Sequence, residues 1–255
     1  MTSSTMMKTI SPLPLMAWIG GGGDLIGFSQ TFYMWNPITG EQLTMKDKHM
    51  HACGLYFNPI RKDYELLYYT TFGKYCNYSA YCLRTKIRRD VGRFSYPPSR
   101  NRPPVIVKGT LYWMIDRRHY YWLNSGFRPP FSDSIMSFNI ETEEFGTLEP
   151  GGRKYSTTEP RGEYSNGMLS IGQLHLSEID GELCLCDFNS TLNQLLLSIF
   201  NHATRCWSTR TIIILPEYDI RYMFDGANTF SAEVIQIKNN ELLLVSETNE
   251  KTFAL

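Results

Sequence analysis

The segment from Val105 to Leu148 constrains the fold more than any other part of the sequence, because it is typical of four short β-strands separated by turns. In its third strand, SIMSFNI (134–140), apolar and polar side chains alternate, as expected of a strand with one buried face. The earlier runs VIV and LYWMI are rich in β-branched and aromatic residues, and the turn KGT separates them. Four strands within roughly 40 to 50 residues are the size of one propeller blade. We therefore interpret the segment as an antiparallel four-stranded meander.

Two short phrases recur along the chain and extend this interpretation. The first is a small turn before an apolar strand, and it occurs as GDL (23–25), GTL (109–111), GEL (181–183) and NEL (240–242). The second is a later strand that runs into a turn, as in MWNPITGEQL, SFNIETEEF and IFNHATRCW. Helical periodicity is nearly absent, and 42% hydrophobic residues are enough for a large core. We predict an all-β fold, a β-propeller-like array of antiparallel four-stranded meanders that is incomplete at the C-terminus.

The chain is expected to form one domain preceded by a tail. We predict a disordered N-terminal tail over residues 1–17 and the propeller-like domain over residues 18–255. The sequence holds no run of about 18 apolar residues, so we expect no membrane span. It carries 25 basic and 25 acidic side chains, and this balance gives no global field that favours nucleic acid or an anionic membrane.

The six cysteines are typical of a reducing compartment, because they form no CxxC pair and no histidine lies at zinc-finger spacing from them. Cys184 and Cys186 would share one face of a strand and could serve a metal, but two small buried hydrophobes are the simpler interpretation. We expect a cytoplasmic and/or nuclear protein without a metal or cofactor.

Catalytic motifs are missing from the sequence. None of the five histidines lies in an HExxH motif, and no GxSxG nucleophile elbow occurs. Gly20 to Gly23 lack the lysine and the following helix of a phosphate-binding loop. Loops distant in sequence can assemble a catalytic site on a propeller, and that alternative stays open. We predict that the chain is not an enzyme.

A set of phrases in a fixed order carries a resemblance to a known family. They are WNPITGE, YELLYY with YCLRT, RPPVIVKGTLYWMID, SIMSFNIETEEF, and LSEIDGELCLCDF followed by CW. Together they resemble the F-box associated domain of the large plant F-box protein family, over Trp18 to Leu255. The resemblance implies a kelch-like propeller that recruits the substrate of a cullin-based ubiquitin ligase. It also implies that an N-terminal F-box docks on the Skp adaptor.

The sequence departs from the family pattern in two places. Nothing before Trp18 resembles the helices of an F-box, so we expect a Skp-type adaptor and a cullin ligase as partners only if an F-box is supplied elsewhere. The tryptophan that usually follows the turn of the second unit is replaced by Ile87, Arg88 and Arg89. Direct docking on the ligase is therefore not expected.

A protein partner of unknown identity is the expected ligand, held by loops at one end of the blades. Aromatic residues and arginines supply most of the contact energy in such surfaces. The aromatic loop 117–131, RRHYYWLNSGFRPPF, has that composition. Its candidate residues are Tyr120, Tyr121, Trp122 and Arg128. The alternative is that these rings pack under their own loop.

A second candidate surface lies in the segment from Arg84 to Lys108, which carries eight basic residues against the single acid Asp90. Its proline pairs favour an extended connector. The candidate residues are Arg88, Arg89 and Arg93. The segment could bind RNA or another single-stranded nucleic acid, which is the alternative function, or it could be a solvated loop. Nucleic-acid binding would weaken steeply with salt, whereas an aromatic pocket would barely respond.

Overall fold

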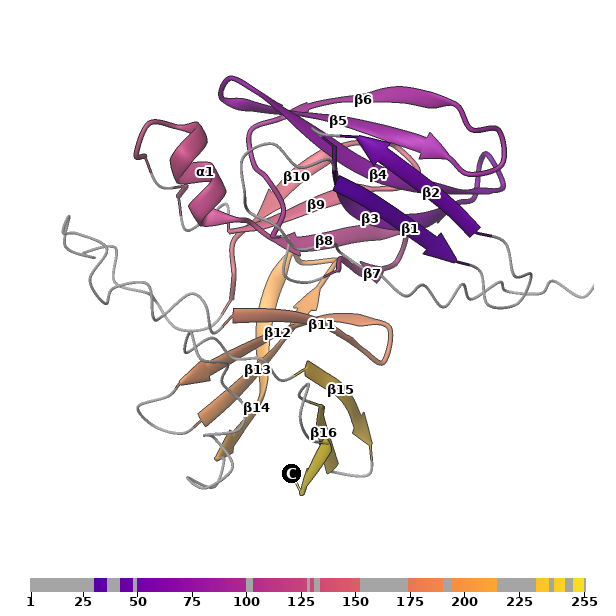
Figure 1. Ribbon diagram of the computed structural model, residues 1–255. Helices are drawn as coiled ribbons and strands as arrows, with labels where there is room; N and C mark the ends of the chain where they lie inside the picture. The colour runs from indigo at the N-terminus through magenta and orange to yellow at the C-terminus, as the bar shows by residue number, and fades with distance from the viewer. Residues whose placement is uncertain are drawn as a thin grey trace, which may run out of the picture. The chain divides into compact units, whose positions relative to one another are not determined.

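The computed structural model describes residues 30–35, 42–47, 50–99, 103–127, 129–130, 134–151, 174–189, 194–214, 233–238, 241–245 and 250–254. The predicted tail over 1–17 and the glycine run at 20–23 lie outside these residues. The described residues form seventeen β-strands and one short helix (Figure 1). The chain divides into two compact units, Met1–Ala52 and Cys53–Leu255. The first unit contains the antiparallel hairpin of β1 (Gln30–Trp35) and β2 (Gln42–Asp47).

Three four-stranded antiparallel sheets follow, and in each of them the strands pair in chain order. The first sheet contains β3 (His51–Asn58), β4 (Asp63–Phe72), β5 (Tyr75–Cys82) and β6 (Arg88–Phe94). The second contains β7 (Val105–Val107), β8 (Thr110–Met114), β9 (Ile135–Asn139) and β10 (Phe145–Leu148). The third contains β11 (Leu174–Ile179), β12 (Glu182–Asn189), β13 (Gln194–Asn201) and β14 (Cys206–Ile214). A last sheet has three strands, β15 (Glu233–Lys238), β16 (Glu241–Val245) and β17 (Glu250–Ala254).

These sheets confirm the predicted all-β array of meanders. The segment from Val105 to Leu148 forms the four strands that its alternating pattern predicted, with Leu111 opposite Phe138 and Trp113 opposite Met136. Those four side chains are buried, as the period-two pattern requires. Successive sheets then pack face to face through further apolar residues, which is how the blades of a propeller cover one another.

The extended connector predicted for residues 84–108 is wrong over 88–94, where the chain forms β6 as the fourth strand of the first sheet. The strand was hard to recognise because basic residues separate its apolar side chains. Two of these, Val91 and Phe94, pack against the core. The ladder with β5 contains a bulge beside Tyr78, and Gly92 lies opposite with φ of 135°, a conformation that favours glycine. Three arginines and one aspartate in seven residues therefore do not prevent strand pairing here.

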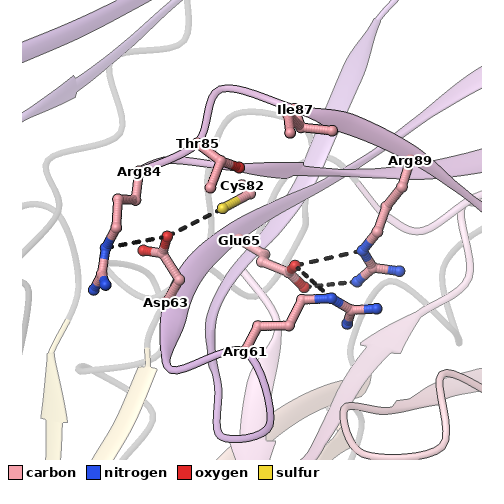
Figure 2. Close-up of a pocket in the computed structure, with 8 residues that line it drawn as sticks. All are labelled: Arg61, Asp63, Glu65, Cys82, Arg84, Thr85, Ile87 and Arg89. Atoms are coloured by element: carbon pink, nitrogen blue, oxygen red, sulfur yellow. Dashed lines mark hydrogen bonds and ion pairs between the residues drawn. The ribbon is translucent and has the colours of Figure 1, made fainter.

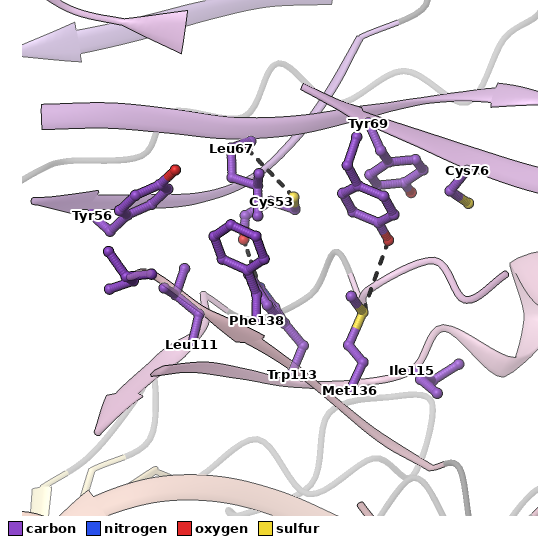
Figure 3. Packing of buried hydrophobic residues seen from close by; sticks show 12 residues of the cluster. Cys53, Tyr56, Leu67, Tyr69, Cys76, Leu111, Trp113, Ile115, Met136 and Phe138 are labelled. Atoms are coloured by element: carbon purple, nitrogen blue, oxygen red, sulfur yellow. Dashed lines mark hydrogen bonds between the residues drawn. The ribbon is translucent and has the colours of Figure 1, made fainter. Parts of the chain in front are cut away.

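The core of the second unit begins between the first two sheets. Figure 3 shows Trp113, Phe138 and Met136 facing Tyr56 and Tyr69 from the neighbouring sheet. The Tyr56 and Phe138 rings meet edge to face, with centroids 5.8 Å apart. Trp113 Nε1 donates to the carbonyl of Cys53 at 2.6 Å, so the buried indole also satisfies its polar group. A second cluster joins the next pair of sheets, and it contains Val107, Ile135, Leu148, Leu174, Leu185 and Phe200.

Gly54 allows β3 to approach β8 closely. A Cβ atom at this position would lie 2.8 Å from Leu111 Cδ2, 3.1 Å from Trp113 Cζ2 and 3.3 Å from Pro104 Cγ. We predict that Gly54→Ala lowers the free energy of unfolding by about 1–2 kcal/mol, because the core must shift to admit one carbon. Urea denaturation measures the change. In the double variant Gly54→Ala/Leu111→Val the cost should be smaller than the sum of the single changes. An additive result would contradict the close contact.

Three observations concern membrane spans, metal sites and the state of the cysteines. Among the described residues, no helix has the length and apolar character needed to cross a membrane. Within the same residues, no group of three or more His, Cys, Asp or Glu side chains is arranged to hold a metal ion. Cys184 and Cys186 are both buried in β12, in keeping with the simpler interpretation of that pair. All six cysteines are free thiols.

Candidate interaction surfaces

The first two four-stranded sheets have two different ends. At one end, which we call the turn end, the connections are the short turns 59–62, 83–87, 108–109 and 140–144. A backbone hydrogen bond from Ile140 to Gly109 and an ion pair between Arg61 and Glu143 hold these turns together. At the other end, the insertion end, the long connections 95–104 and 115–134 leave the sheets. The amide of Asp116 donates to the carbonyl of Pro97 there, so these two connections lie side by side.

The connection 115–134 contains the helix α1 (Arg117–Leu123), where the sequence predicted an aromatic loop. Asp116 caps the helix, because its carboxylate accepts a hydrogen bond from the amide of His119 at 2.8 Å. At the other end, the amide of Asn124 donates to the carbonyl of Tyr120. The loop prediction was wrong because two helical turns are too short to show a 3.6-residue period.

Side chains on one face of α1 fasten it to the first sheet. Tyr69 Oη and His119 Nδ1 lie 3.3 Å apart. The Tyr120 ring stacks on Tyr96, with centroids 5.2 Å apart and planes 22° from parallel. Leu123 packs against the core. Tyr120, one of the predicted partner-binding residues, is therefore a packing residue, as the alternative interpretation expected.

The opposite face of α1 and the turn after it carry the most exposed aromatic side chains of this region. Trp122 is 71% exposed and Phe127 is 72% exposed. We call these two residues the α1 surface. Tyr121 is half-buried, and its ring lies beside Gly126. Arg128 lies outside the described residues.

Phe127 was not among the residues predicted from the sequence. It follows a Ser-Gly turn, in which Ser125 and Gly126 have positive φ of 54° and 90°. A turn of this kind is visible in the sequence, but it does not tell whether the next ring points inward or outward. Exposure of Phe127 therefore could not be read from residue type alone.

The turn end contains a pocket of about 400 Å³ (Figure 2). The residues that line it come from the turns 59–62 and 83–87 and from the strands beside them. They are Arg61, Asp63, Glu65, Cys82, Arg84, Thr85, Ile87 and Arg89. Three arginines and two carboxylates thus surround one opening. One feature of the sequence indicates this pocket, namely the acidic Glu65 within the apolar run YELLYY.

Glu65 is the centre of a buried polar network. Its side chain has no exposed surface, and its carboxylate accepts hydrogen bonds from Arg89 at 2.7 Å, Tyr56 at 2.9 Å and Asn58 at 3.0 Å. Burial alone would raise the pKa of Glu65, but the hydrogen bonds from Arg89, Asn58 and Tyr56 outweigh it and hold this pKa below its ordinary value. The carboxylate is therefore ionised and fully paired in the folded protein.

Glu143 extends the network to the neighbouring sheet. Its carboxylate, in the turn between β9 and β10, pairs with Arg61 at 2.6 Å and with Arg89. Arg89 thus bridges two carboxylates from different sheets, and its side chain is only 22% exposed. Burial alone would lower the pKa of Arg89, but Glu65 raises it above its ordinary value. We interpret Arg89 as a residue that joins the two sheets.

The three arginines predicted as one basic surface do not come together. Arg88 is exposed at the turn end, with its guanidinium 5.6 Å from the centre of the Tyr68 ring. Arg89 is enclosed in the network with Glu65. Arg93 is exposed near the opposite end of β6, where it pairs in register with Asn77. A strand rises about 3.3 Å per residue, so Arg88 and Arg93 lie roughly 16 Å apart.

Comparisons with known proteins agree with the fold. The family model described as an F-box associated beta propeller domain matches residues 22–255. No curated protein sequence matches the chain. Among solved structures, TolB from Acinetobacter baumannii is 10% identical with a TM-score of 0.41, over 88% of this chain and 45% of that one.

Two further solved structures are similar at the same level. A putative dipeptidyl aminopeptidase IV from Bacteroides ovatus is 12% identical with a TM-score of 0.39, over 88% of this chain and 32% of that one. An oligogalacturonate lyase from Vibrio parahaemolyticus is 10% identical with a TM-score of 0.39, over 94% of this chain and 74% of that one. The chain spans less than half the length of the first structures that it resembles. At these TM-scores the likeness carries no functional argument.

Proposed function

The chain belongs to the F-box associated β-propeller family, and from that premise we propose that it is a protein–protein interaction module that recognises substrates for a cullin-based ubiquitin ligase. The observation that supports this proposal is the α1 surface. A helix fastened to a sheet by His119 and Tyr120 presents Trp122 and Phe127 outward. Exposed aromatic side chains on a rigid support are the usual anchors of protein interfaces, because they bury much area at little cost in conformational entropy.

The insertion end suits partner binding better than the turn end for a second reason. Its connections 95–104 and 115–134 are much longer than the turns at the other end. Long connections on a rigid scaffold commonly carry binding residues.

In this proposal the domain binds the substrate of the ligase and has no catalytic role. A Skp-type adaptor and a cullin are expected in the complex only when an F-box is supplied. Free thiols throughout the six cysteines suit the reducing cytoplasm or nucleus, where we place the protein. The nucleic-acid alternative has less support, because Arg88, Arg89 and Arg93 do not form one surface.

Truncation of the α1 surface tests the proposal. We predict that Trp122→Ala/Phe127→Ala abolishes capture of the partner, because loss of one central aromatic anchor alone typically weakens binding about 30-fold. The measurement is quantitative crosslinking and mass spectrometry in cells, followed by binding of the identified protein to the purified chain. Ubiquitin conjugates of that protein should depend on the chain in the same cells.

A matched control uses two aromatic residues that are exposed elsewhere. Phe72, the last residue of β4, is 73% exposed, and Tyr75, the first residue of β5, is 52% exposed. By strand alternation, Phe72 points to the face opposite Tyr69, which contacts α1. Phe72→Ala/Tyr75→Ala should therefore retain the partner. Recovery of the same proteins by all three chains would contradict the proposal.

A further inference from the structure

The turn end carries a group of exposed cations on two neighbouring turns. A hydrogen bond of 3.1 Å from Arg84 Nη2 to the carbonyl of Lys62 holds the turns 59–62 and 83–87 side by side. Neither turn contains an aspartate or a glutamate. Arg61 is exposed but pairs with Glu143. The other exposed cations are Lys62, Arg84 and Lys86 on the turns and Arg88 at the start of β6, which we call the cationic rim.

Two carboxylates, Asp63 and Glu65, are buried beneath the cationic rim and already have partners. Asp63 is 7% exposed, and it accepts hydrogen bonds from the Tyr64 amide at 2.7 Å and from Cys82 Sγ at 3.0 Å and forms an ion pair with Arg84 at 3.5 Å. Glu65 is enclosed in the network with Arg89. Lys62 and Lys86 form no ion pair with any residue in the described part of the chain. The turns 59–62 and 83–87 therefore present positive charge to solvent, whereas the exposed Glu141 and Glu144 lie on the adjacent turn 140–144.

Apolar side chains are interspersed with these cations. Ile60 is 63% exposed and Ile87 is 62% exposed, one on each of the two turns. In Figure 2, Ile87 lies on the wall of the pocket between Arg84 and Arg89. Phe57, at the end of β3, is 42% exposed and contacts the Tyr64 ring edge to face. The surface thus combines cations with aliphatic groups around an opening of about 400 Å³.

We propose that the cationic rim is a second binding site, which takes an acidic protein segment carrying a bulky apolar residue. Carboxylates of the segment would complement Lys62 and Lys86, and its apolar residue would cover Ile60 and Ile87. The aliphatic groups favour a peptide over a nucleic acid, whose phosphate backbone would leave them exposed. This site lies at the opposite end from the α1 surface, so it goes beyond the proposed function and does not depend on it.

Charge reversal at the two unpaired lysines tests this site. The probe is a fluorescein-labelled peptide of glutamates with two leucines, and fluorescence anisotropy follows its binding to the full chain at low salt. We predict that Lys62→Glu/Lys86→Glu weakens binding about tenfold or more, because like charges would then face each other. Raising the salt concentration should weaken binding to the native chain as well.

The matched control reverses two cations at the insertion end. Lys74 and Arg93 are exposed, and neither side chain forms an ion pair with a residue that the structure describes. Lys74→Glu/Arg93→Glu changes the net charge equally and should alter the affinity less than about twofold. Lys62→Gln/Lys86→Gln gives a milder variant, because glutamine removes the positive charge without reversing it. Glutamine is also unbranched at Cβ, which suits the positive φ of 52° and 58° at these positions. This variant should weaken binding by an intermediate factor at an unchanged Tm.

Three outcomes would overturn this inference. One is the absence of binding to the native chain at low salt. The second is equal weakening by the rim variant and by the insertion-end control, which would show a response to net charge alone. The third is tighter binding of a labelled oligouridine than of the peptide with the same dependence on the rim, which would assign the surface to nucleic acid. None of these outcomes bears on the α1 surface, whose test uses different residues.

Discussion

Replacing Arg89 with leucine is expected to lower the free energy of unfolding by about 3–5 kcal/mol, the largest effect of any single change considered for this protein. The substitution removes the cation that bridges Glu65 and Glu143. Glu65 would then be left as a buried carboxylate without its strongest partner. A charge that loses its partner in the interior keeps the cost of its desolvation, and this cost accounts for the size of the effect.

The neighbouring arginine provides a control for this prediction. Arg88 precedes Arg89 on the same strand, but it is exposed and lies over the Tyr68 ring. Arg88→Leu should cost about 1 kcal/mol or less, because exposed charge interactions contribute little. Urea denaturation of both variants measures the difference. Equal losses of stability would show that Arg89 has no special role between the sheets.

Acidification is expected to destabilise the protein through Glu65, and Glu65→Gln should remove that part of the pH dependence. The pKa of Glu65 is held below its ordinary value in the folded protein, so the unfolded chain binds its proton more readily. The stabilisation is complete above the unfolded pKa of about 4.3 and is lost as the pH falls through the folded pKa. At neutral pH, Glu65→Gln should cost about 2–3 kcal/mol, because it loses charge-assisted hydrogen bonds.

Urea midpoints between neutral pH and pH 3 test this expectation. Glu182 has its pKa lowered by the hydrogen bond from Lys108, so it contributes with the same sign in both proteins. The difference between the native chain and the Glu65→Gln variant therefore isolates Glu65. Parallel curves for the two proteins would rule out the buried carboxylate as a source of acid sensitivity.

Strands with strong alternation were predictable from the sequence. In SIMSFNI, the apolar positions Met136, Phe138 and Ile140 are buried, and that alternation also fixed the meander around it. The third sheet contains two of the recurring phrases, GEL (181–183) and IFNHATRCW, which mark its turns in the sequence. The fold could be predicted because burial on one face leaves a signature of two residues in every such strand.

The site residues were harder to predict, because their roles depend on partners distant in sequence. Arg88 and Arg89 look alike in the sequence, yet one is exposed and the other bridges Glu65 and Glu143. Tyr120 and Trp122 likewise share one aromatic run, but Tyr120 stacks on Tyr96 whereas Trp122 is exposed. Composition singled out these segments, whereas the direction of each side chain depends on tertiary contacts that no local pattern records.

The bridge made by Glu143 also has a mechanical consequence. The Glu143 carboxylate, on a five-residue turn, forms ion pairs with Arg61 and Arg89 of the adjacent sheet. A force that separates the two sheets must therefore break two charged contacts together. These contacts resist shear between the two sheets at the turn end, whereas the insertion end tolerates variation in loop length. New recognition residues could therefore be placed at the exposed positions 122 and 127, provided that His119, Tyr120 and Leu123, which hold α1, are kept.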